Sequence, residues 1–446
     1  MRQSDRADGQ ARTRAARRGR TAGPGRWLAI TAVTGVAGLL AAACSSGPPA
    51  PTTPAASRSA ASASAAAAAA QLHISPGDGH HNVNPGKGIT VTAASGTIKT
   101  VTVTSGHQTV GGSFNGAHTV WRNHWALQPS RSYTVRATAV NSSGTAIAST
   151  SSFRTLTPAA SDIAMIFEGY KQSYGVGMPI RITFSSPVTN KAAVEKSLQI
   201  KSSKPVTGAW YWDGSQTLYF RTMNYWPANT TVSFNGHLDG VEASPGVFFT
   251  ADLTQTFDIG PSLVVVASTK THYLNVFYKG KLWGHWPIST GRPGLDTVDG
   301  TYITLEKGNP VRMVGNGYNE LVNDAVRFTY SGDYLHSAPW SVGEQGITNV
   351  SHGCVNLSPQ HAAMYYNLAT PGDPVTVTGS PHTGKWGDGF TVWFLSWKQL
   401  LKGSATGQAV QVTSSGSTFV SPSSVTQTPD TSRLGGAKPD NYAAQS

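Results

Sequence analysis

Alternation of apolar and polar side chains in short segments, separated by Gly, Asn and Pro, is the feature that most limits how this chain can fold. The pattern runs through residues 72–158 and is clear in residues 133–140, Tyr-Thr-Val-Arg-Ala-Thr-Ala-Val. A period of two predicts half-buried antiparallel strands, because successive side chains of a strand point to opposite faces. We therefore expect a small β-sandwich over residues 72–158, with Trp121 and Trp125 packed between its sheets.

The same alternation continues over residues 159–260, for example in Ile180–Phe184. Each block has the length and turn spacing of an immunoglobulin-like sandwich, so two such domains are predicted. The 446 residues exceed the usual size of a single hydrophobic core, which agrees with several domains. Trp210 and Trp212 could hold glycan if they were exposed, but packing in the core and at a sheet edge is the favoured interpretation.

A third β-rich region is expected over residues 261–379. A short helix is predicted where Ser358 can cap and Pro359 fits the first turn, with residues 361–368 following. Residues 380–405 are expected to form a C-terminal extension that packs on this third region. Residues 406–446 are rich in Ser, Thr, Gln, Gly and Pro, which predicts a disordered tail. The predicted fold class is mainly β.

The first residues have the pattern of an export signal. Eight Arg in residues 1–26 precede a 17-residue apolar run, 27–43, which is short for a membrane span and typical of a secretory signal. Its end, Leu-Leu-Ala-Ala-Ala-Cys, resembles a bacterial lipoprotein cleavage site at which Cys44 takes the lipid. The alternative is an ordinary signal peptide cut near the same Ala run. Residues 44–71 then form a low-complexity linker.

These features predict an exported protein, anchored by Cys44 to the outer face of the cell membrane and facing the cell wall. Residues 1–26 contribute +6 of the net charge of +12, so a charge of +6 would remain on the mature chain. A positive charge suits an anionic cell wall. No nucleic-acid-binding module is present in the sequence.

Cys354 is the strongest candidate for a reactive residue, because the chain has only one other cysteine, Cys44. A thiol in an oxidising compartment is a liability unless it is buried and inert or has a catalytic use. A nucleophilic thiol needs a base. His352 shares the face of Cys354 on an extended segment but lies roughly 6 to 7 Å along it, so His336, arriving from an adjacent strand, is the preferred base.

The residues around Cys354 favour the catalytic interpretation. Gly353 permits a tight turn, and backbone N–H groups near Gly353 and Cys354 can form an oxyanion hole. Residues 337–346 form a loop with Gly hinges and an aromatic side chain that can close over a substrate.

His336, followed after 14 residues by Ser-His-Gly-Cys-Val-Asn at 351–356, matches a known motif. The chain thereby resembles the L,D-transpeptidases with a YkuD-type catalytic domain, and among them the actinobacterial lipoproteins with two immunoglobulin-like domains. A departure is Thr297–Tyr302, where many relatives have Thr-Pro-x-Gly. The resemblance implies catalytic roles for Cys354 (nucleophile), His336 (proton donor and acceptor), Ser337 (backbone carbonyl orienting the His), His352 and Gly353 (oxyanion region). It implies substrate contacts for Tyr318, Ser331, Gly332, Ser351 and Asn356.

The resemblance also implies a reaction. Cys354 attacks the third residue of a peptidoglycan tetrapeptide stem, D-Ala leaves, and an amine of a neighbouring stem resolves the thioester into a 3→3 cross-link. Carbapenem-type β-lactams are expected to acylate the same thiol. No cofactor is expected, and no metal, because His73, His80 and His81 lack a recognised ligand spacing. The alternatives are an L,D-carboxypeptidase or hydrolase of stem peptides, and a non-catalytic wall-binding surface protein. The acceptor amine and the donor preference stay open.

Overall fold

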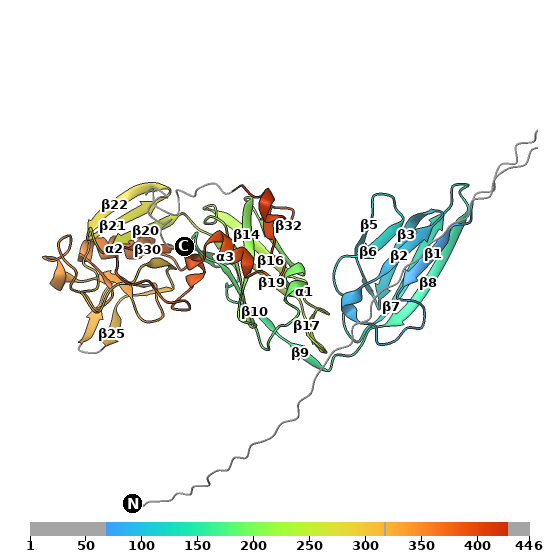
Figure 1. The fold of residues 1–446 in the computed structure, drawn as a ribbon, viewed down its shortest axis with the longest axis horizontal. Coiled ribbons are helices and arrows are strands. Elements are labelled where there is room, and N and C mark those ends of the chain that lie inside the picture. Colours follow the sequence, from blue (N-terminus) through green and yellow to red (C-terminus); the bar gives the residue numbers. More distant parts are fainter. Residues whose placement is uncertain (1–67, 316–317, 427–446) are drawn as a thin grey trace, which may run out of the picture. The chain divides into compact units, whose positions relative to one another are not determined.

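The computed structural model describes residues 68–315 and 318–426 (Figure 1). These residues are mainly β, and the predicted fold class is confirmed. The predicted signal peptide (1–43) and the lipidated Cys44 lie outside the described residues, as does the linker up to residue 67. Within the described part of the chain, no helix combines the length and the apolar character needed to cross a membrane.

The first module is a sandwich of two four-stranded sheets, ordered β1-β2-β6-β5 and β4-β3-β7-β8. Its strands are β1 (Gln71–Ser75), β2 (Thr90–Ala94), β3 (Thr97–Ser105), β4 (Gln108–Thr109), β5 (Gly112–Phe114), β6 (Val120–Asn123), β7 (Ser132–Val140) and β8 (Ala146–Arg154), with a 3₁₀ turn η1 (Pro85–Lys87).

Trp121 is buried between these sheets, as predicted, whereas the same prediction for Trp125 is wrong. Trp125 is 36% exposed and stacks on His237 of the second module, with ring centroids 3.9 Å apart. The reason is that β6 ends at Asn123, so Trp125 lies in the following loop and no longer obeys the alternation of the strand.

The second module consists of a six-stranded sheet, β10-β12-β15-β14-β31-β32, a four-stranded sheet, β11-β19-β16-β13, and a three-stranded sheet, β17-β18-β9. Its first elements are β9 (Ala160–Asp162), β10 (Ala164–Ile166), β11 (Ser173–Tyr174), β12 (Ile180–Phe184), α1 (Lys191–Lys196), β13 (Leu198–Ser202), β14 (Val206–Asp213), β15 (Thr217–Thr222), β16 (Thr230–Gly236), β17 (Glu242–Ser244), β18 (Val247–Phe249) and β19 (Leu253–Ile259). Trp210 and Trp212 are buried in the core of this module, which confirms the packing interpretation.

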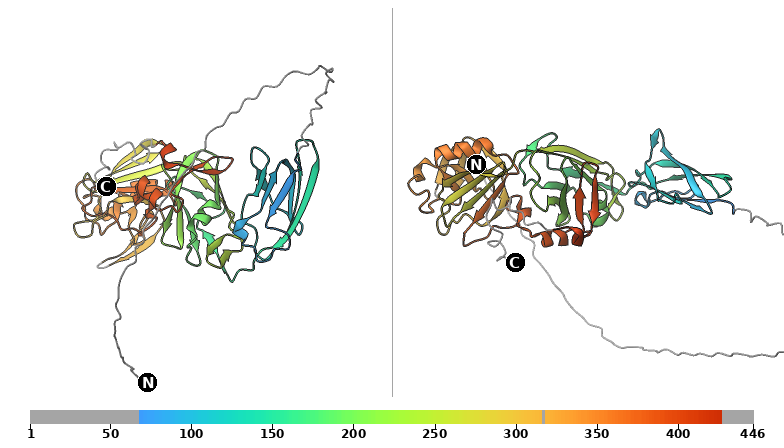
Figure 2. Two further views of the ribbon diagram at one scale, coloured as in Figure 1. Left: turned by 45° about the vertical axis from the view of Figure 1, so that its right-hand side comes forward. Right: turned by 90° about the horizontal axis from the view of Figure 1, so that it is seen from above.

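The last two strands of this module come from the far end of the chain, and this corrects the predicted disordered tail. Strands β31 (Ala409–Val412) and β32 (Ser417–Val420) complete the six-stranded sheet, where Val412 pairs with Val206 and Val410 with Gly208 (Figure 2). A 3₁₀ turn η4 (Pro422–Ser424) follows. The prediction was wrong for residues 406–426, because a short Ala-Val-Gln-Val strand does not stand out in a polar composition. Residues 427–446 lie outside the described residues.

A buried carboxylate holds this returning segment. Glu195 of α1 is fully buried and accepts hydrogen bonds from Trp212 Nε1 (2.8 Å), from Ser404 Oγ (2.8 Å) and from the Ala405 N–H (2.7 Å). The contacts to residues 404–405 join α1 to the segment that leads into β31. A buried charge is tolerated only when it is hydrogen-bonded in this way.

The extension, residues 380–405, packs on the second module as well as on the third region. Trp393 of the 3₁₀ helix η3 (Thr391–Phe394) is buried in the core of the second module, where its Nε1 donates to the Gly177 carbonyl at 2.7 Å. The next residue, Phe394, stacks edge-on against Tyr302 of the third region at 5.0 Å. Helix α3 (Trp397–Lys402) follows and begins with a capping box. The sequence analysis predicted packing on the third region only, whereas the extension also packs on the second module.

The third region has a five-stranded sheet, β22-β21-β20-β30-β23, a four-stranded sheet, β24-β27-β28-β29, and the hairpin β25-β26. Its elements are β20 (Leu263–Ser268), β21 (Tyr273–Tyr278), β22 (Lys281–Pro287), β23 (Gly300–Ile303), β24 (Glu306–Gly308), β25 (Val311–Gly315), β26 (Tyr318–Val322), β27 (Ala325–Arg327), β28 (Tyr334–Ser337), η2 (Pro339–Ser341), β29 (Val355–Leu357), α2 (Pro359–Leu368) and β30 (Pro374–Thr378). The predicted helix is confirmed: Ser358 caps α2 by accepting from the His361 N–H.

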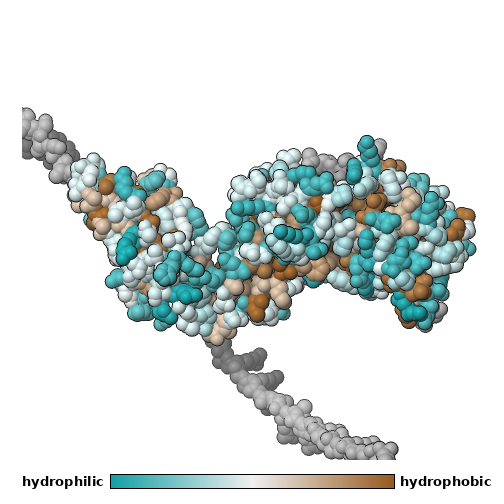
Figure 3. All heavy atoms as spheres, turned by 180° about the vertical axis from the view of Figure 1, so that it is seen from behind, coloured by the Kyte–Doolittle hydropathy of each residue, from teal (hydrophilic) through white to brown (hydrophobic). Residues whose placement is uncertain are grey.

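Hydrophobic and hydrophilic residues are mixed on the face of the molecule in Figure 3, where apolar residues form small groups among polar ones. Three apolar residues near the start of the second module, Ile163, Met165 and Phe167, are exposed. Much of any protein surface is apolar, so exposure by itself does not identify a binding face.

Candidate active site

Two neighbouring parallel strands bring the predicted nucleophile and base together. Strands β28 and β29 pair with His336 opposite Asn356, and Cys354 directly precedes β29. His336 and Cys354 therefore lie at the same end of the sheet, and both line a cavity of about 230 Å³. The prediction that His336 arrives from an adjacent strand is confirmed.

The imidazole of His336 is held in the tautomer that leaves Nε2 free to accept a proton. The side chain is 3% exposed, and its Nδ1 lies 2.9 Å from the carbonyl oxygen of Ser337. Because a carbonyl can only accept, the Nδ1–H must be the donor. Burial lowers the pKa of His336 and the bond to Ser337 opposes this shift, so the ring is neutral near pH 7.

The thiol of Cys354 is protonated at rest. It donates to the carbonyl oxygen of Gly332 at 3.8 Å. The cysteine is partly buried, and this burial raises its pKa to about 12, with the negative charge of Asp333 adding to the rise. A thiol in this state needs a base to remove its proton before the sulfur can act as a nucleophile.

The turn before Cys354 requires glycine at position 353. Gly353 has a φ of +133°, and a Cβ placed there would lie 2.5 Å from Asp333 Oδ1. Ser351 closes the turn, since its Oγ donates to the Cys354 carbonyl at 2.6 Å and accepts from the Gly353 N–H at 3.2 Å. The Gly353 N–H is thus engaged inside the turn, which leaves the Cys354 N–H as the predicted oxyanion donor.

His352 is exposed beside the nucleophile and has two neighbours. Arg292 Nη1 donates to its Nε2 at 2.9 Å, and the ring of Tyr318 lies 4.8 Å from its own. The pKa of His352 is lowered by burial and further by the charge of Arg292. The Nε2 lone pair of His352 is thus engaged by Arg292 and is not available to take a proton, which agrees with the rejection of His352 as the catalytic base. Sequence reasoning missed Arg292, although the bridges from Ser289 to Asn356 and from Gly291 to Ser351 join its loop to the motif.

The residues with predicted substrate contacts fall into two groups. Tyr318, Ser351 and Asn356 line the cavity, although Asn356 is buried and donates through Nδ2 to Ser341 Oγ at 3.0 Å. Gly332 instead accepts from the thiol, and Ser331 is bound by a carboxylate. The N–H and Oγ of Ser331 donate to the two carboxylate oxygens of Asp388, at 2.7 and 2.6 Å. Asp388 belongs to the extension and was not predicted.

The rest of the cavity wall is largely apolar, with one acidic side chain. It is formed by Met313, Glu320, Val322, Trp340 and Val350. Trp340 comes from the loop that was predicted to close over a substrate. Among the described residues, no group of three His, Cys, Asp or Glu side chains is arranged to hold a metal ion.

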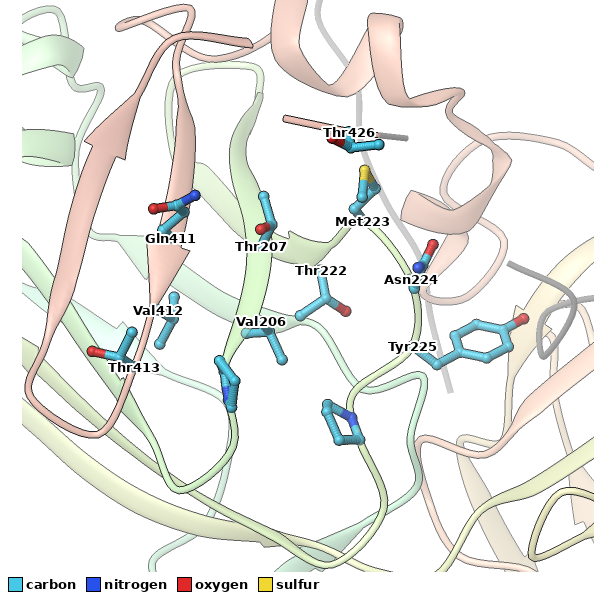
Figure 4. A pocket seen from close by; sticks show the side chains of 12 residues that line it. Val206, Thr207, Thr222, Met223, Asn224, Tyr225, Gln411, Val412, Thr413 and Thr426 are labelled. Atoms are coloured by element: carbon cyan, nitrogen blue, oxygen red, sulfur yellow. The ribbon is translucent and has the colours of Figure 1, made fainter. Parts of the chain in front are cut away.

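A larger hollow of about 580 Å³ lies in the second module, between β14, β31 and the loop after β15 (Figure 4). Val206, Thr207, Tyr225, Gln411 and Thr426 are among its lining residues. The lining contains no cysteine, histidine or carboxylate. The hollow therefore lacks the thiol, imidazole and carboxylate groups that the cavity at Cys354 brings together, and that cavity is the candidate active site.

Comparison with known proteins gives matches along most of the described chain. Residues 80–242 match the family of bacterial Ig domains, and residues 262–377 match the family of L,D-transpeptidase catalytic domains, YkuD. L,D-transpeptidase 2 of Mycobacterium tuberculosis (strain CDC 1551 / Oshkosh) is 32% identical over 405 residues, which cover 88% of this chain and 98% of the relative.

Two further matches concern about half of the chain. L,D-transpeptidase 1 of Mycobacterium tuberculosis (strain ATCC 25618 / H37Rv) is 39% identical over 215 residues, 46% of this chain and 80% of the relative. The solved structure of LD transpeptidase LdtMt1 in complex with imipenem is 35% identical, covers 50% of this chain and all of that one, and has a TM-score of 0.42.

Proposed function

The chain belongs to the L,D-transpeptidase family, and on that premise we propose that it transfers acyl groups between peptidoglycan stem peptides through a thioester on Cys354. One observation carries the proposal. The parallel pairing of β28 with β29 sets the thiol and a neutral imidazole with a free Nε2 on the same cavity. This is the arrangement of a nucleophile with its general base.

In the acylation step, Nε2 of His336 takes the thiol proton while Sγ attacks the carbonyl of the third stem residue. The C–S bond forms, the amide C–N bond breaks, and the proton passes from His336 to the nitrogen of the leaving D-Ala. The Cys354 N–H is directed at the oxyanion in this proposal. Ser337 keeps the ring oriented throughout, because its carbonyl holds the Nδ1–H.

In the second step, an amine of a neighbouring stem attacks the thioester. The C–N bond forms, the C–S bond breaks, and His336 carries a proton from the amine to the sulfur. The product is a 3→3 cross-link when the amine is the side chain of the third residue of the acceptor stem. One amide replaces another, so the exchange needs no external energy source.

The direct test uses the mature protein and a disaccharide tetrapeptide, with the products followed by mass spectrometry. We expect loss of D-Ala and appearance of a cross-linked dimer, and we expect Cys354→Ala to abolish both. Activity retained by Cys354→Ala would contradict the proposal. Loss of D-Ala without any dimer would instead identify a carboxypeptidase, in which water resolves the thioester.

The same thiol is proposed to react with carbapenem-type β-lactams. Their strained amide is an acyl donor of the same kind as the stem peptide, and the solved LdtMt1 structure is a complex with imipenem. We expect the intact mass of the protein to rise by the mass of one imipenem, with the adduct on the peptide that contains Cys354. An unchanged mass after prolonged incubation would count against this extension.

We also propose that the chain is exported and lipidated at Cys44, as its first residues indicate. The support is the sequence alone: the basic residues, the apolar run and the Ala-Ala-Ala-Cys ending. Metabolic labelling with a radioactive fatty acid should mark the wild-type protein and leave Cys44→Ala unlabelled. Equal labelling of both proteins would refute lipidation at this position.

A further inference from the structure

Glu320 places an exposed carboxylate on the wall of the active-site cavity. It lies in β26, opposite Met313 of β25, and it is flanked at i−2 and i+2 by Tyr318 and Val322. Side chains two residues apart on a strand share a face. All four of these residues line the cavity together with Cys354. The face of β26 that carries Glu320 is therefore turned toward the nucleophile.

Glu320 is the one lining residue with a fixed charge. The other ten lining residues are Cys354, the two histidines and seven residues with apolar or neutral polar side chains. Arg292 donates to His352 Nε2 and is not among the lining residues. The cavity therefore presents one negative group to whatever enters it.

The two substrates differ in where their positive charge lies relative to the reacting bond. In the donor, the attacked carbonyl is uncharged, the leaving D-Ala is anionic, and the side-chain ammonium of the third residue forms no bond. In the acceptor, the ammonium is itself the group that must reach the thioester. An aliphatic amine is an ammonium ion at neutral pH, and it must reach the thioester before it loses a proton. An exposed carboxylate on the wall of the same cavity is the group that attracts such a cation.

We propose that Glu320 binds the ammonium group of the acyl acceptor and makes the enzyme selective for cationic amines. This inference rests on the proposed transpeptidase function. The ammonium loses one proton to solvent after binding, the amine then attacks the thioester carbonyl, the C–N bond forms and the C–S bond breaks. The second proton moves from nitrogen through His336 Nε2 to the sulfur. Glu320 binds and orients the acceptor and takes no part in these transfers.

The test separates the two half-reactions in the full mature protein. The donor is a tetrapeptide stem whose own side-chain amine is acetylated, so that it forms the acyl-enzyme and cannot act as an acceptor. Two acceptors are compared at pH 7.5: a tripeptide stem with a free side-chain amine, which is cationic, and hydroxylamine, which is neutral at this pH and also cleaves thioesters. Acyl-enzyme and products are measured by mass spectrometry.

For Glu320→Gln we expect a KM for the cationic tripeptide about tenfold higher than in the wild type. That is the size of a partly solvated charge-assisted contact. The rate of acylation by the donor and the KM for hydroxylamine should stay within about twofold. Raising the salt concentration to 0.5 M should raise the tripeptide KM of the wild type and leave that of the variant nearly unchanged, because salt screens the attraction.

Asp324→Asn is the matched control. Asp324 is a second carboxylate near the end of the same hairpin, but it does not line the cavity, and Asn309 Nδ2 donates to its Oδ1. Its φ of +51° is one that Asn readily adopts, and an Asn side chain keeps an acceptor oxygen for Asn309. The control should behave as the wild type with both acceptors.

Three outcomes overturn the inference. The first is an unchanged tripeptide KM in Glu320→Gln, and the second is an equal loss with hydroxylamine, which would indicate a general defect of the hairpin. The third is an equal rise of the tripeptide KM in Asp324→Asn, which would indicate a diffuse charge effect. A wild-type protein that forms no acyl-enzyme at all refutes the proposed function instead, and the two failures are distinguishable.

Discussion

Replacing the partly buried Asp333 by Asn is expected to change how the reactivity of Cys354 depends on pH. Asp333 Oδ1 lies against the turn before Cys354, 2.5 Å from where a Cβ of residue 353 would stand. Burial raises the pKa of this carboxyl to about 6, while a hydrogen bond from Thr329 opposes the shift. Once ionised, Asp333 raises the pKa of the Cys354 thiol in turn. The two groups therefore titrate as a coupled pair.

The size of this coupling follows from Coulomb's law. If the two groups are treated as unit charges about 6 Å apart, their interaction is about 3 kcal/mol at an effective dielectric constant of about 20, which corresponds to about two pKa units. Asp333 is partly exposed, so solvent screening reduces the coupling to about one unit. A plot of log rate against pH should then rise with a slope of one below pH 6, flatten over about one pH unit, and rise again.

The assay is alkylation of the mature protein by iodoacetamide between pH 5 and pH 9, with the peptide containing Cys354 quantified by mass spectrometry. In Asp333→Asn the flat segment should disappear, and the rate at pH 8 should rise about three- to tenfold. The tenfold value is the expected increase in the thiolate fraction. The threefold value allows for the weaker nucleophilicity of a less basic thiolate. Asp324→Asn serves as the control and should keep the flat segment.

The sign of the accompanying stability change is also fixed. A carboxyl with a raised pKa favours the folded state fully below about pH 3.8, and this stability is lost as the pH rises through about 6. Asp333→Asn should therefore be more stable than the wild type at pH 8, by about 1 to 2 kcal/mol, and gain nothing at pH 4, as measured by urea unfolding. A straight rate profile in the wild type, or a variant that is less stable at pH 8, would refute the reasoning.

The remaining predictions concern the turn, the extension and the returning strands. Gly353→Ala should reduce acylation by a tetrapeptide or imipenem at least a hundredfold, because the new Cβ meets Asp333 and the backbone φ of +133° is strained for Ala; acylation at the wild-type rate would contradict this. Asp388→Ala should slow acylation about three- to tenfold by releasing Ser331, with little change in unfolding temperature; an unchanged rate in rapid-quench mass spectrometry would argue that the loop is held by other contacts. Glu195→Ala should destabilise the protein by about 3 kcal/mol or more, since several buried donors lose their acceptor, and limited proteolysis should then cut between residues 403 and 420, whereas the wild type resists.

Much of the fold and of the catalytic pair could be predicted because the relevant signals are local. The strands of the first two modules follow from the period-two pattern, and the helix after the motif follows from Ser358 and Pro359 at its start. His336 could be chosen over His352 from geometry alone, since a residue two positions away on an extended segment lies too far along the strand. The structure adds the reason why His336 works, which is the tautomer set by Ser337.

The features that were missed depend on contacts between distant parts of the chain. The pairing of β31 with β14 joins residues about two hundred positions apart, and neither partner indicates the other in sequence. Arg292 and Asp388 reach the site through loops, where no periodicity exists to predict the direction of a side chain. Trp125 was misplaced because the pattern gives no sign of where a strand ends.

The return of the C-terminal strands to the second module has a consequence for how the protein is made. The chain leaves the second module after β19, builds the whole third region, and only then supplies β31 and β32 to the sheet edge at β14. During synthesis and export, the edge of β14 therefore stays unpaired until about 150 further residues, counted from Ile259 to Ala409, have been made. An unpaired edge is a site for wrong pairing and aggregation. A chain that ends anywhere before β31 leaves that edge unpaired. The sheet of the second module can therefore be completed only after the whole catalytic region has been synthesised.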